Sequence, residues 1–234
     1  MSIKQFSLKF QHKNSYLEED FFVSDSNRIA KNLIDLWPIW PQPIVAIYGP
    51  EGSGKTHLAQ IWGQKSQSYF FTYSKTNLEQ WLQLSKSFKT FVFDDQEEVR
   101  KNDKQNFEKF FFHLLNLIKK KKKNLLICSQ MPPSRWSVDL PDLQSRLETI
   151  QAVPIYPPDD FLITALLVKK FSDYQLTINK RIIDYILTHT ERSFVAIHHI
   201  VQQIDEYNLA SKKPLNLSLV RQIIKNLNSH KKDL

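Results

Sequence analysis

Apolar and polar residues alternate along this chain in blocks that predict strands and helices in turn. Short apolar runs, typical of buried strands, occur at 44–48, 68–73, 90–93, 124–129 and 149–153. Between these runs, apolar positions spaced three or four residues apart favour helices at 57–62, 77–84 and 106–118. Strands that alternate with helices predict an α/β fold in which helices flank a parallel sheet on both faces.

From residue 159 onward the pattern changes to helices only. The apolar spacing predicts four of them, at 160–172, 179–188, 193–207 and 218–227. The proline-rich segment 153–158 separates these helices from the strands. We therefore predict an N-terminal peptide and linker over 1–20, an α/β nucleotide-binding domain over 21–156 and a small all-helical lid domain over 157–234.

A glycine-rich segment, GPEGSGKT at 49–56, matches the phosphate-binding pattern G-x-x-x-x-G-K-[ST]. Three of the four glycines of the chain lie in it: Gly49, Gly52 and Gly54. Because a predicted strand precedes the segment and a predicted helix follows it, its backbone N–H groups and the helix N-terminus are expected to bind phosphate. We interpret the segment as the phosphate site of a nucleoside triphosphate or diphosphate.

Individual side chains of this segment have expected roles. Lys55 would lie against the β- and γ-phosphates, and the hydroxyl of Thr56 would ligate Mg²⁺. Ser53 and His57, which flank this pair, are also assigned to the nucleotide site.

Polar residues at the ends of two later strands extend this site. Asp94 is placed to hold Mg²⁺, and Asp95 could orient or activate a water molecule. At the end of the strand at 124–129, Ser129 and Gln130 either present polar groups near the γ-phosphate or cap the strand. The seven histidines have no ligand spacing, so we expect no metal other than Mg²⁺.

The composition of the chain bears on its cellular compartment and on the partners that it could bind. The single cysteine, the absence of a secretion signal and the absence of a long apolar stretch favour the cytoplasm and argue against a membrane partner. The net charge is +8, and much of it lies in local runs such as the five lysines at 119–123. Such a run either binds DNA without sequence specificity or is the solvated end of a helix.

With these segments in order, the chain resembles the AAA+ ATPases of the DnaA family from Phe22 onward. Residues 22–27 are similar to the family's N-terminal box, which implies that Phe22, Val23 and Asn27 surround the adenine. The segments 49–56 and 91–95 match its Walker A and B motifs, and 127–130 aligns with its sensor I. The segment 140–147 is similar to the one that carries the arginine finger, which implies that role for Arg146.

Two departures from the family pattern qualify what the resemblance implies. The chain ends at Leu234, just after the expected lid, where DnaA continues into a helix-turn-helix domain. The sensor II arginine of the family aligns with Val195, and Arg192 could replace it in contacting the nucleotide. The resemblance therefore implies weak or no intrinsic ATPase activity.

A DnaA-like core of this extent resembles the Hda family of DnaA regulators. Residues 5–10, QFSLKF, are similar to that family's clamp-binding peptide, in which Gln5, Leu8 and Phe10 would contact the polymerase III β sliding clamp. The resemblance implies an ADP- or ATP-bound protein with Mg²⁺ that binds the clamp and supplies Arg146 in trans to stimulate hydrolysis of DnaA-bound ATP.

The resemblance also leaves two points of assembly open. DNA contact would be indirect through the clamp, and a homo-oligomer is possible. The alternative function is a DnaA-like ATPase or loader that acts through its own hydrolysis and DNA binding.

Overall fold

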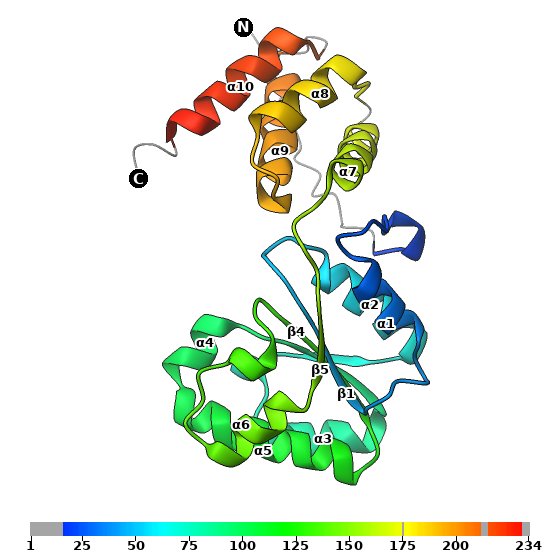
Figure 1. The fold of residues 1–234 in the computed structure, drawn as a ribbon, viewed down its shortest axis with the longest axis vertical. Helices are drawn as coiled ribbons and strands as arrows, with labels where there is room; N and C mark the ends of the chain where they lie inside the picture. Colours follow the sequence, from blue (N-terminus) through cyan, green and yellow to red (C-terminus); the bar gives the residue numbers. More distant parts are fainter. Residues whose placement is uncertain (1–15, 175, 212–214, 231–234) are drawn as a thin grey trace, which may run out of the picture. The chain divides into compact units, whose positions relative to one another are not determined.

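The computed structural model describes residues 16–174, 176–211 and 215–230. These residues form two compact units, one from Tyr16 to Pro157 and one that begins at Pro158 (Figure 1). The first unit contains, in chain order, η1 (Glu18–Asp20), α1 (Arg28–Asp35), β1 (Ile44–Tyr48), α2 (Lys55–Ser66), β2 (Tyr69–Phe71), η2 (Tyr73–Lys75), α3 (Leu78–Ser87), β3 (Thr90–Asp94), α4 (Glu97–Asn102), α5 (Lys104–Lys120), β4 (Asn124–Ser129), η3 (Pro133–Arg135), α6 (Pro141–Glu148) and β5 (Gln151–Pro154).

The five strands of the first unit form one parallel sheet in the order β2-β3-β4-β1-β5. The register pairs Tyr48 at the end of β1 with Ser129 at the end of β4, and Asp94 at the end of β3 with Cys128. Because all strands run in the same direction, their carboxyl ends lie at one edge of the sheet. Loops that follow β1, β3 and β4 therefore meet at that edge, where α/β proteins bind ligands.

Helices cover both faces of this sheet, as Figure 1 shows. Neighbouring residues of β1 point to opposite faces: Val45 and Ile47 pack with α1 and α2, whereas Ala46 packs with residues of α3, α5 and α6. Helix α5 supplies large apolar side chains such as Phe107 and Phe111, both fully buried. The two apolar clusters fix the sheet and hence the loops at its edge.

The second unit consists of helices: α7 (Asp160–Asp173), α8 (Lys180–His189), α9 (Phe194–Ser211) and α10 (Leu217–His230). Its own apolar core includes Phe171, Ile186, Ile204 and Val220. Within the described ranges, no helix is long and apolar enough to span a membrane.

The structure confirms the predicted α/β fold with a helical C-terminal part. It contains each predicted strand and helix; β1 and β4 have the predicted ends, and the ends of the other elements are shifted. Three helices were not predicted: α1, α4 and α6. Each has eight residues or fewer, and α4 has the sequence EEVRKN, in which a single apolar residue gives no periodic signal. These helices depend on contacts with the rest of the unit.

Candidate nucleotide-binding site

The glycine-rich loop connects β1 to α2 at the carboxyl edge of the sheet. Gly52 and Gly54 have φ angles of 71° and 92°, which favour glycine. A Cβ atom on Gly49 would collide with the carbonyl oxygen of Ile155, so this position requires glycine for space. The loop is thus built from positions where a side chain is strained or excluded, as expected of a backbone cradle for phosphate.

Lys55, the first residue of α2, reaches back across the loop. Its Nζ atom donates hydrogen bonds to the carbonyl oxygens of Gly49 at 2.9 Å and Pro50 at 2.8 Å. Burial lowers the pKa of the ammonium group, and the charge of Asp94 opposes this shift. The lysine is therefore held over the loop, where it would contact phosphate oxygens.

Asp94 and Thr56 are the residues that could ligate Mg²⁺. Asp94 ends β3 and is exposed, yet desolvation by the surrounding protein raises its pKa while the nearby charge of Lys55 lowers it. Thr56 is exposed in the first turn of α2. A carboxylate and a hydroxyl beside a phosphate cradle are the oxygen ligands that Mg²⁺ prefers, so these residues fit the ion.

Asp95 lies in a different environment from Asp94. Its carboxylate accepts a hydrogen bond from Nε of Arg100 at 3.2 Å, and both side chains are nearly buried. Burial raises the pKa of Asp95 to about 6, against the opposing effect of Arg100. The Arg100 guanidinium also lies 4.6 Å from the ring centroid of Trp136. The predicted role of Asp95 toward water remains a prediction, and any such role must compete with this ion pair.

The sequence did not point to Arg100. It lies on α4, a helix without apolar periodicity, and its partners Asp95 and Trp136 come from separate segments. Only the fold brings the three together.

The N-terminal box forms a hydrogen-bonded turn before α1. The Oδ1 atom of Asn27 accepts from the N–H of Ser24 at 2.9 Å, and its Nδ2 donates to the carbonyl of Phe22 at 2.8 Å. The N–H of Tyr156 donates to the carbonyl of Ser26, so the turn is attached to the end of β5. Val23 is 41% exposed. Asn27 is buried, and the two hydrogen bonds of its side chain stabilise the turn.

His57 and Phe21 form a further wall beside the glycine-rich loop. The ring of His57 lies edge-on to Phe21, with centroids 5.3 Å apart, and its Nε2 is 3.0 Å from the carbonyl oxygen of Leu17. The ring of Phe21 lies so close to Gly54 that an added Cβ would be 3.3 Å from it. Phe21 was not among the predicted site residues.

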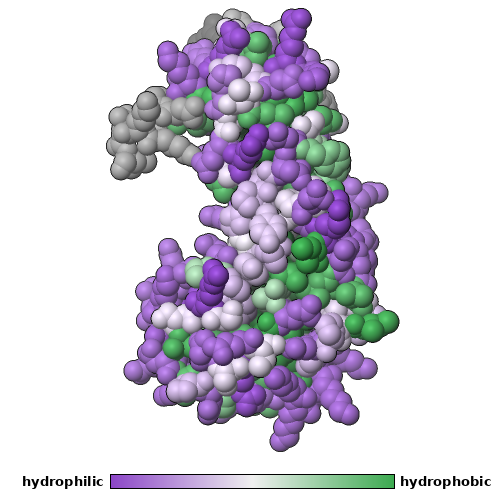
Figure 2. All heavy atoms as spheres, viewed as in Figure 1, coloured by the Kyte–Doolittle hydropathy of each residue, from purple (hydrophilic) through white to green (hydrophobic). Residues whose placement is uncertain are grey.

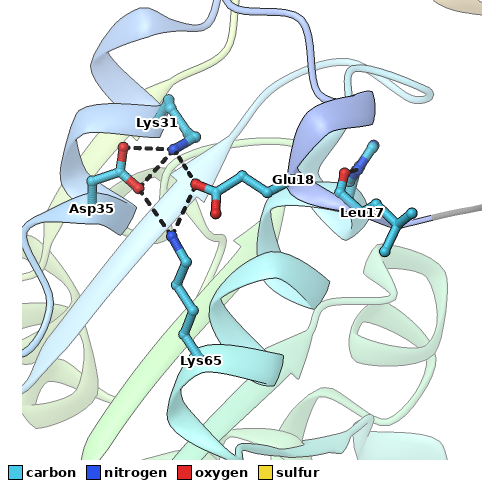
Figure 3. Close-up of polar contacts among 6 residues, drawn as sticks. Leu17, Glu18, Lys31, Asp35 and Lys65 are labelled. Carbon is cyan, nitrogen blue, oxygen red and sulfur yellow. Dashed lines mark hydrogen bonds and ion pairs between the residues drawn. The ribbon is translucent and has the colours of Figure 1, made fainter.

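A network of charged residues attaches η1 to the two helices beneath it (Figure 3). The carboxylate of Glu18 accepts hydrogen bonds from Lys31 of α1 and Lys65 of α2, each at 2.9 Å. Lys31 also donates to Asp35. The network fixes the segment that carries Leu17 and Phe21 beside His57.

Two polar residues at the end of β4, Ser129 and Gln130, are the ones predicted to lie near the γ-phosphate or to cap the strand. Ser129 is buried and donates from its hydroxyl to the carbonyl of Met131, while its own carbonyl accepts from the N–H of Gly49. Gln130 follows it and is exposed. Ser129 thus joins β4 to the glycine-rich loop, and the role of Gln130 remains a prediction.

Arg146 lies on α6, away from this loop. Its guanidinium is 4.9 Å from the ring centroid of Phe112, and it lines a small pocket with Ile44 and Lys119. Ile44 begins β1, whereas the glycine-rich loop follows the other end of that strand, about 13 Å away at the usual rise per residue. Arg146 is therefore near the amino edge of the sheet, whereas the glycine-rich loop is at the carboxyl edge.

Glu108 holds the helix that carries Arg146. Its carboxylate, 5% exposed, accepts hydrogen bonds from the N–H groups of Asp139 at 2.8 Å and Leu140 at 2.9 Å. Leu140 is the N-cap of α6 and has no capping side chain of its own. Glu108, on α5, therefore caps α6 from another helix.

In the second unit, Arg192 forms an exposed ion pair with Asp160, with Nε and Oδ1 3.0 Å apart. Both residues line an open pocket of about 700 Å³ that also includes Thr190. Val195, with which the sensor II arginine of the DnaA family is expected to align, is 42% exposed in the first turn of α9. Whether Arg192 contacts nucleotide remains a prediction, as does the clamp contact of Gln5, Leu8 and Phe10, which lie outside the described residues.

The chain is similar in sequence to known proteins. No protein-family model matches the chain. The chromosomal replication initiator protein DnaA of Campylobacter curvus is 25% identical over the whole of this chain and 58% of its own length. An uncharacterized protein of Haemophilus influenzae is 29% identical over 91% of this chain and 92% of its own length. The chain spans about half the length of the curated DnaA relatives it matches.

Several solved structures, among them DnaA structures, have a fold similar to that of this chain. Domain III of the Thermotoga maritima replication initiation protein DnaA superposes with a TM-score of 0.75 at 19% identity, covering 90% of this chain and 96% of its own. This chain has an AAA+ fold and is related to DnaA. A DnaA structure with AMPPCP and single-stranded DNA gives a TM-score of 0.66 at 22% identity, covering 81% of this chain and 64% of its own. The Thermotoga maritima RuvB branch migration motor gives 0.66 at 14% identity, covering 91% and 72%.

Proposed function

We propose that this DnaA-related chain binds ADP or ATP together with Mg²⁺ at the glycine-rich loop. Three features support the proposal: the glycines of the loop at positions that strain or exclude a side chain, Lys55 held over the loop, and Asp94 at the carboxyl end of β3 at the same edge of the sheet. A DnaA neighbour in structure was solved with AMPPCP, an adenine nucleotide analogue. Bound Mg²⁺ would neutralise charge on the phosphates, with Thr56 and Asp94 as its protein ligands.

We further propose that the chain is an Hda-like regulator that stimulates hydrolysis of ATP bound to DnaA and so prevents re-initiation of replication. The observation that carries this proposal is the position of Arg146 at the sheet edge remote from its own phosphate loop. From there its cation cannot serve the nucleotide of its own loop and is available to a neighbouring molecule. An arginine supplied in trans can raise the rate of phosphoryl transfer by about 10³–10⁵.

The same proposal includes binding of the chain to the sliding clamp. Residues 5–10 would bind the sliding clamp and bring the chain to DnaA on newly replicated DNA, in line with the peptide resemblance in the sequence. The ion pair of Asp95 with Arg100 agrees with slow turnover of the chain's own nucleotide, because the carboxylate would have to leave Arg100 before it could contact a water molecule.

The test is a reconstituted assay with ATP-bound DnaA, loaded clamp and DNA, in which phosphate release is measured. Arg146→Ala is expected to abolish stimulation while nucleotide affinity and clamp binding stay unchanged. Arg135→Ala, an exposed arginine of η3, is the matched control and should stimulate like the parent. Full stimulation by Arg146→Ala would refute the arginine-finger role.

A second candidate is a DnaA-like ATPase or loader that hydrolyses ATP itself. The intact set of Lys55, Thr56 and Asp94 favours it. Turnover by the chain alone, without DnaA, would favour this candidate if Asp94→Asn abolished it. No turnover alone, together with stimulation of DnaA, would favour the regulator.

A further inference from the structure

Two stretches of the α/β unit carry lysines and no acidic residues. No aspartate or glutamate occurs between Glu79 and Asp94, or between Glu108 and Asp139. The first stretch contains Lys86 and Lys89 near the end of α3. The second contains the five lysines 119–123 at the end of α5. In the sequence these are separate groups about thirty residues apart.

The fold joins the two groups. The register of β3 and β4 pairs Thr90 with Asn124, so Lys89 and Lys123, which precede them, are neighbours. The N–H of Asn124 donates to the carbonyl of Lys89 at 3.1 Å.

Two lysines of the run also reach across to α3. Lys121 donates from Nζ to Oγ of Ser85 at 2.8 Å, and Lys123 donates from Nζ to the carbonyl of Phe88 at 2.6 Å. Burial lowers the pKa of Lys123, and the like charges of Lys121 and Lys89 add to that shift. The seven lysines thus form one positive region at the amino edge of the sheet, which we call the lysine surface: Lys86, Lys89, Lys119, Lys120, Lys121, Lys122 and Lys123.

Only two lysines of the lysine surface form the structural hydrogen bonds given above. Lys121 and Lys123 have the structural hydrogen bonds just described. Among the described residues, the other five form no ion pair, and their side chains are exposed: Lys86, Lys89, Lys119, Lys120 and Lys122. Figure 2 shows hydrophilic side chains projecting from the part of the α/β unit where Figure 1 draws α3 and α5. Capping the dipoles of α3 and α5 needs one or two cations each, fewer than are present.

We propose that the lysine surface binds the phosphate backbone of duplex DNA. Lysines are mobile point charges that contact phosphates without reading bases, so the binding would be independent of sequence. No phenylalanine or tryptophan of the two stretches is exposed for stacking on unpaired bases, which favours a duplex over a single strand. This contact would be direct, in addition to any contact through the clamp, and it does not depend on the role of Arg146.

The test compares two variants that each lose three positive charges. One is the lysine-surface variant Lys119→Gln, Lys120→Gln, Lys122→Gln, which leaves the structural lysines 121 and 123 in place. The control variant is Lys109→Gln, Lys180→Gln, Lys225→Gln, at exposed positions outside the surface. Fluorescence anisotropy measures the affinity for a labelled DNA duplex at several salt concentrations. The duplex has about 30 base pairs, which is longer than the footprint of a small domain.

The lysine-surface variant is expected to bind the duplex about 10- to 100-fold more weakly at low salt, with a salt slope smaller by about 2–3 because each phosphate contact contributes about 0.9. The control variant should retain most of the affinity and slope. Melting temperatures equal to that of the parent would verify that both variants fold.

Three results would overturn the proposal. The first is parent-like duplex binding by the lysine-surface variant. The second is an equal loss in both variants, which would indicate net charge rather than this surface. The third is unchanged duplex binding combined with lost binding to phosphatidylserine vesicles, which would indicate a membrane surface as the partner.

Discussion

The cap that Glu108 places on α6 can be tested by removing it. Glu108→Ala deletes a carboxylate that accepts two backbone hydrogen bonds, from Asp139 and Leu140, at the positive end of the helix that carries Arg146. Hydrogen bonds to a charged group contribute about 1.5–3 kcal/mol each. Water can reach the exposed Asp139 once the carboxylate is gone, which offsets part of the loss.

We therefore expect Glu108→Ala to lower the free energy of unfolding by about 2–4 kcal/mol. For a chain of this size the melting temperature would fall by about 5–15 °C. Glu108→Gln keeps one acceptor oxygen and turns an amide N–H₂ toward the second donor, so its loss should be smaller, about 1–2 kcal/mol. Urea unfolding monitored by tryptophan fluorescence measures these differences.

Glu98→Gln is the matched control, because Glu98 is exposed on α4, and it should change stability by less than about 0.5 kcal/mol. A Glu108→Ala variant as stable as this control would show that α6 does not need the cap. If Arg146 acts in trans, the loosened α6 should also reduce stimulation of DnaA while nucleotide affinity is retained.

Three other outcomes follow from the site. Lys55→Ala should abolish binding of ADP and ATP in calorimetry, because it removes the cation over the loop; unchanged affinity would contradict the phosphate assignment. Replacing Gln5, Leu8 and Phe10 together by alanine should abolish clamp binding in a pull-down and leave the melting temperature unchanged. Retained clamp binding would disprove the peptide role. Hydrogen bonds from Lys65 and Lys31 hold the pKa of Glu18 below its usual 4.5, so its stabilising effect is complete at neutral pH and is lost as pH falls through the lower, folded-state value. Glu18→Gln should thus lower the urea midpoint more at about pH 7 than at about pH 3, and an equal effect at both would refute the network's contribution.

Much of the fold follows from local sequence. Apolar runs and helical spacing are properties of neighbouring residues, so they predicted every strand and the long helices. The glycine-rich loop was recognisable for the same reason: its glycines are needed for backbone angles and space within a few residues of each other. Short polar helices such as α4 escaped prediction because their stability comes from contacts outside their own sequence.

The tertiary structure alone decided which distant residues meet. It buried Arg100 against Asp95 and Trp136, and it brought Glu108 to the start of α6. It also joined two lysine groups through the register of β3 and β4, and it separated Arg146 from the loop by the length of β1. These pairings depend on strand order and on the faces to which helices pack, and both are set by burial summed over the whole sheet, which local spacing does not encode.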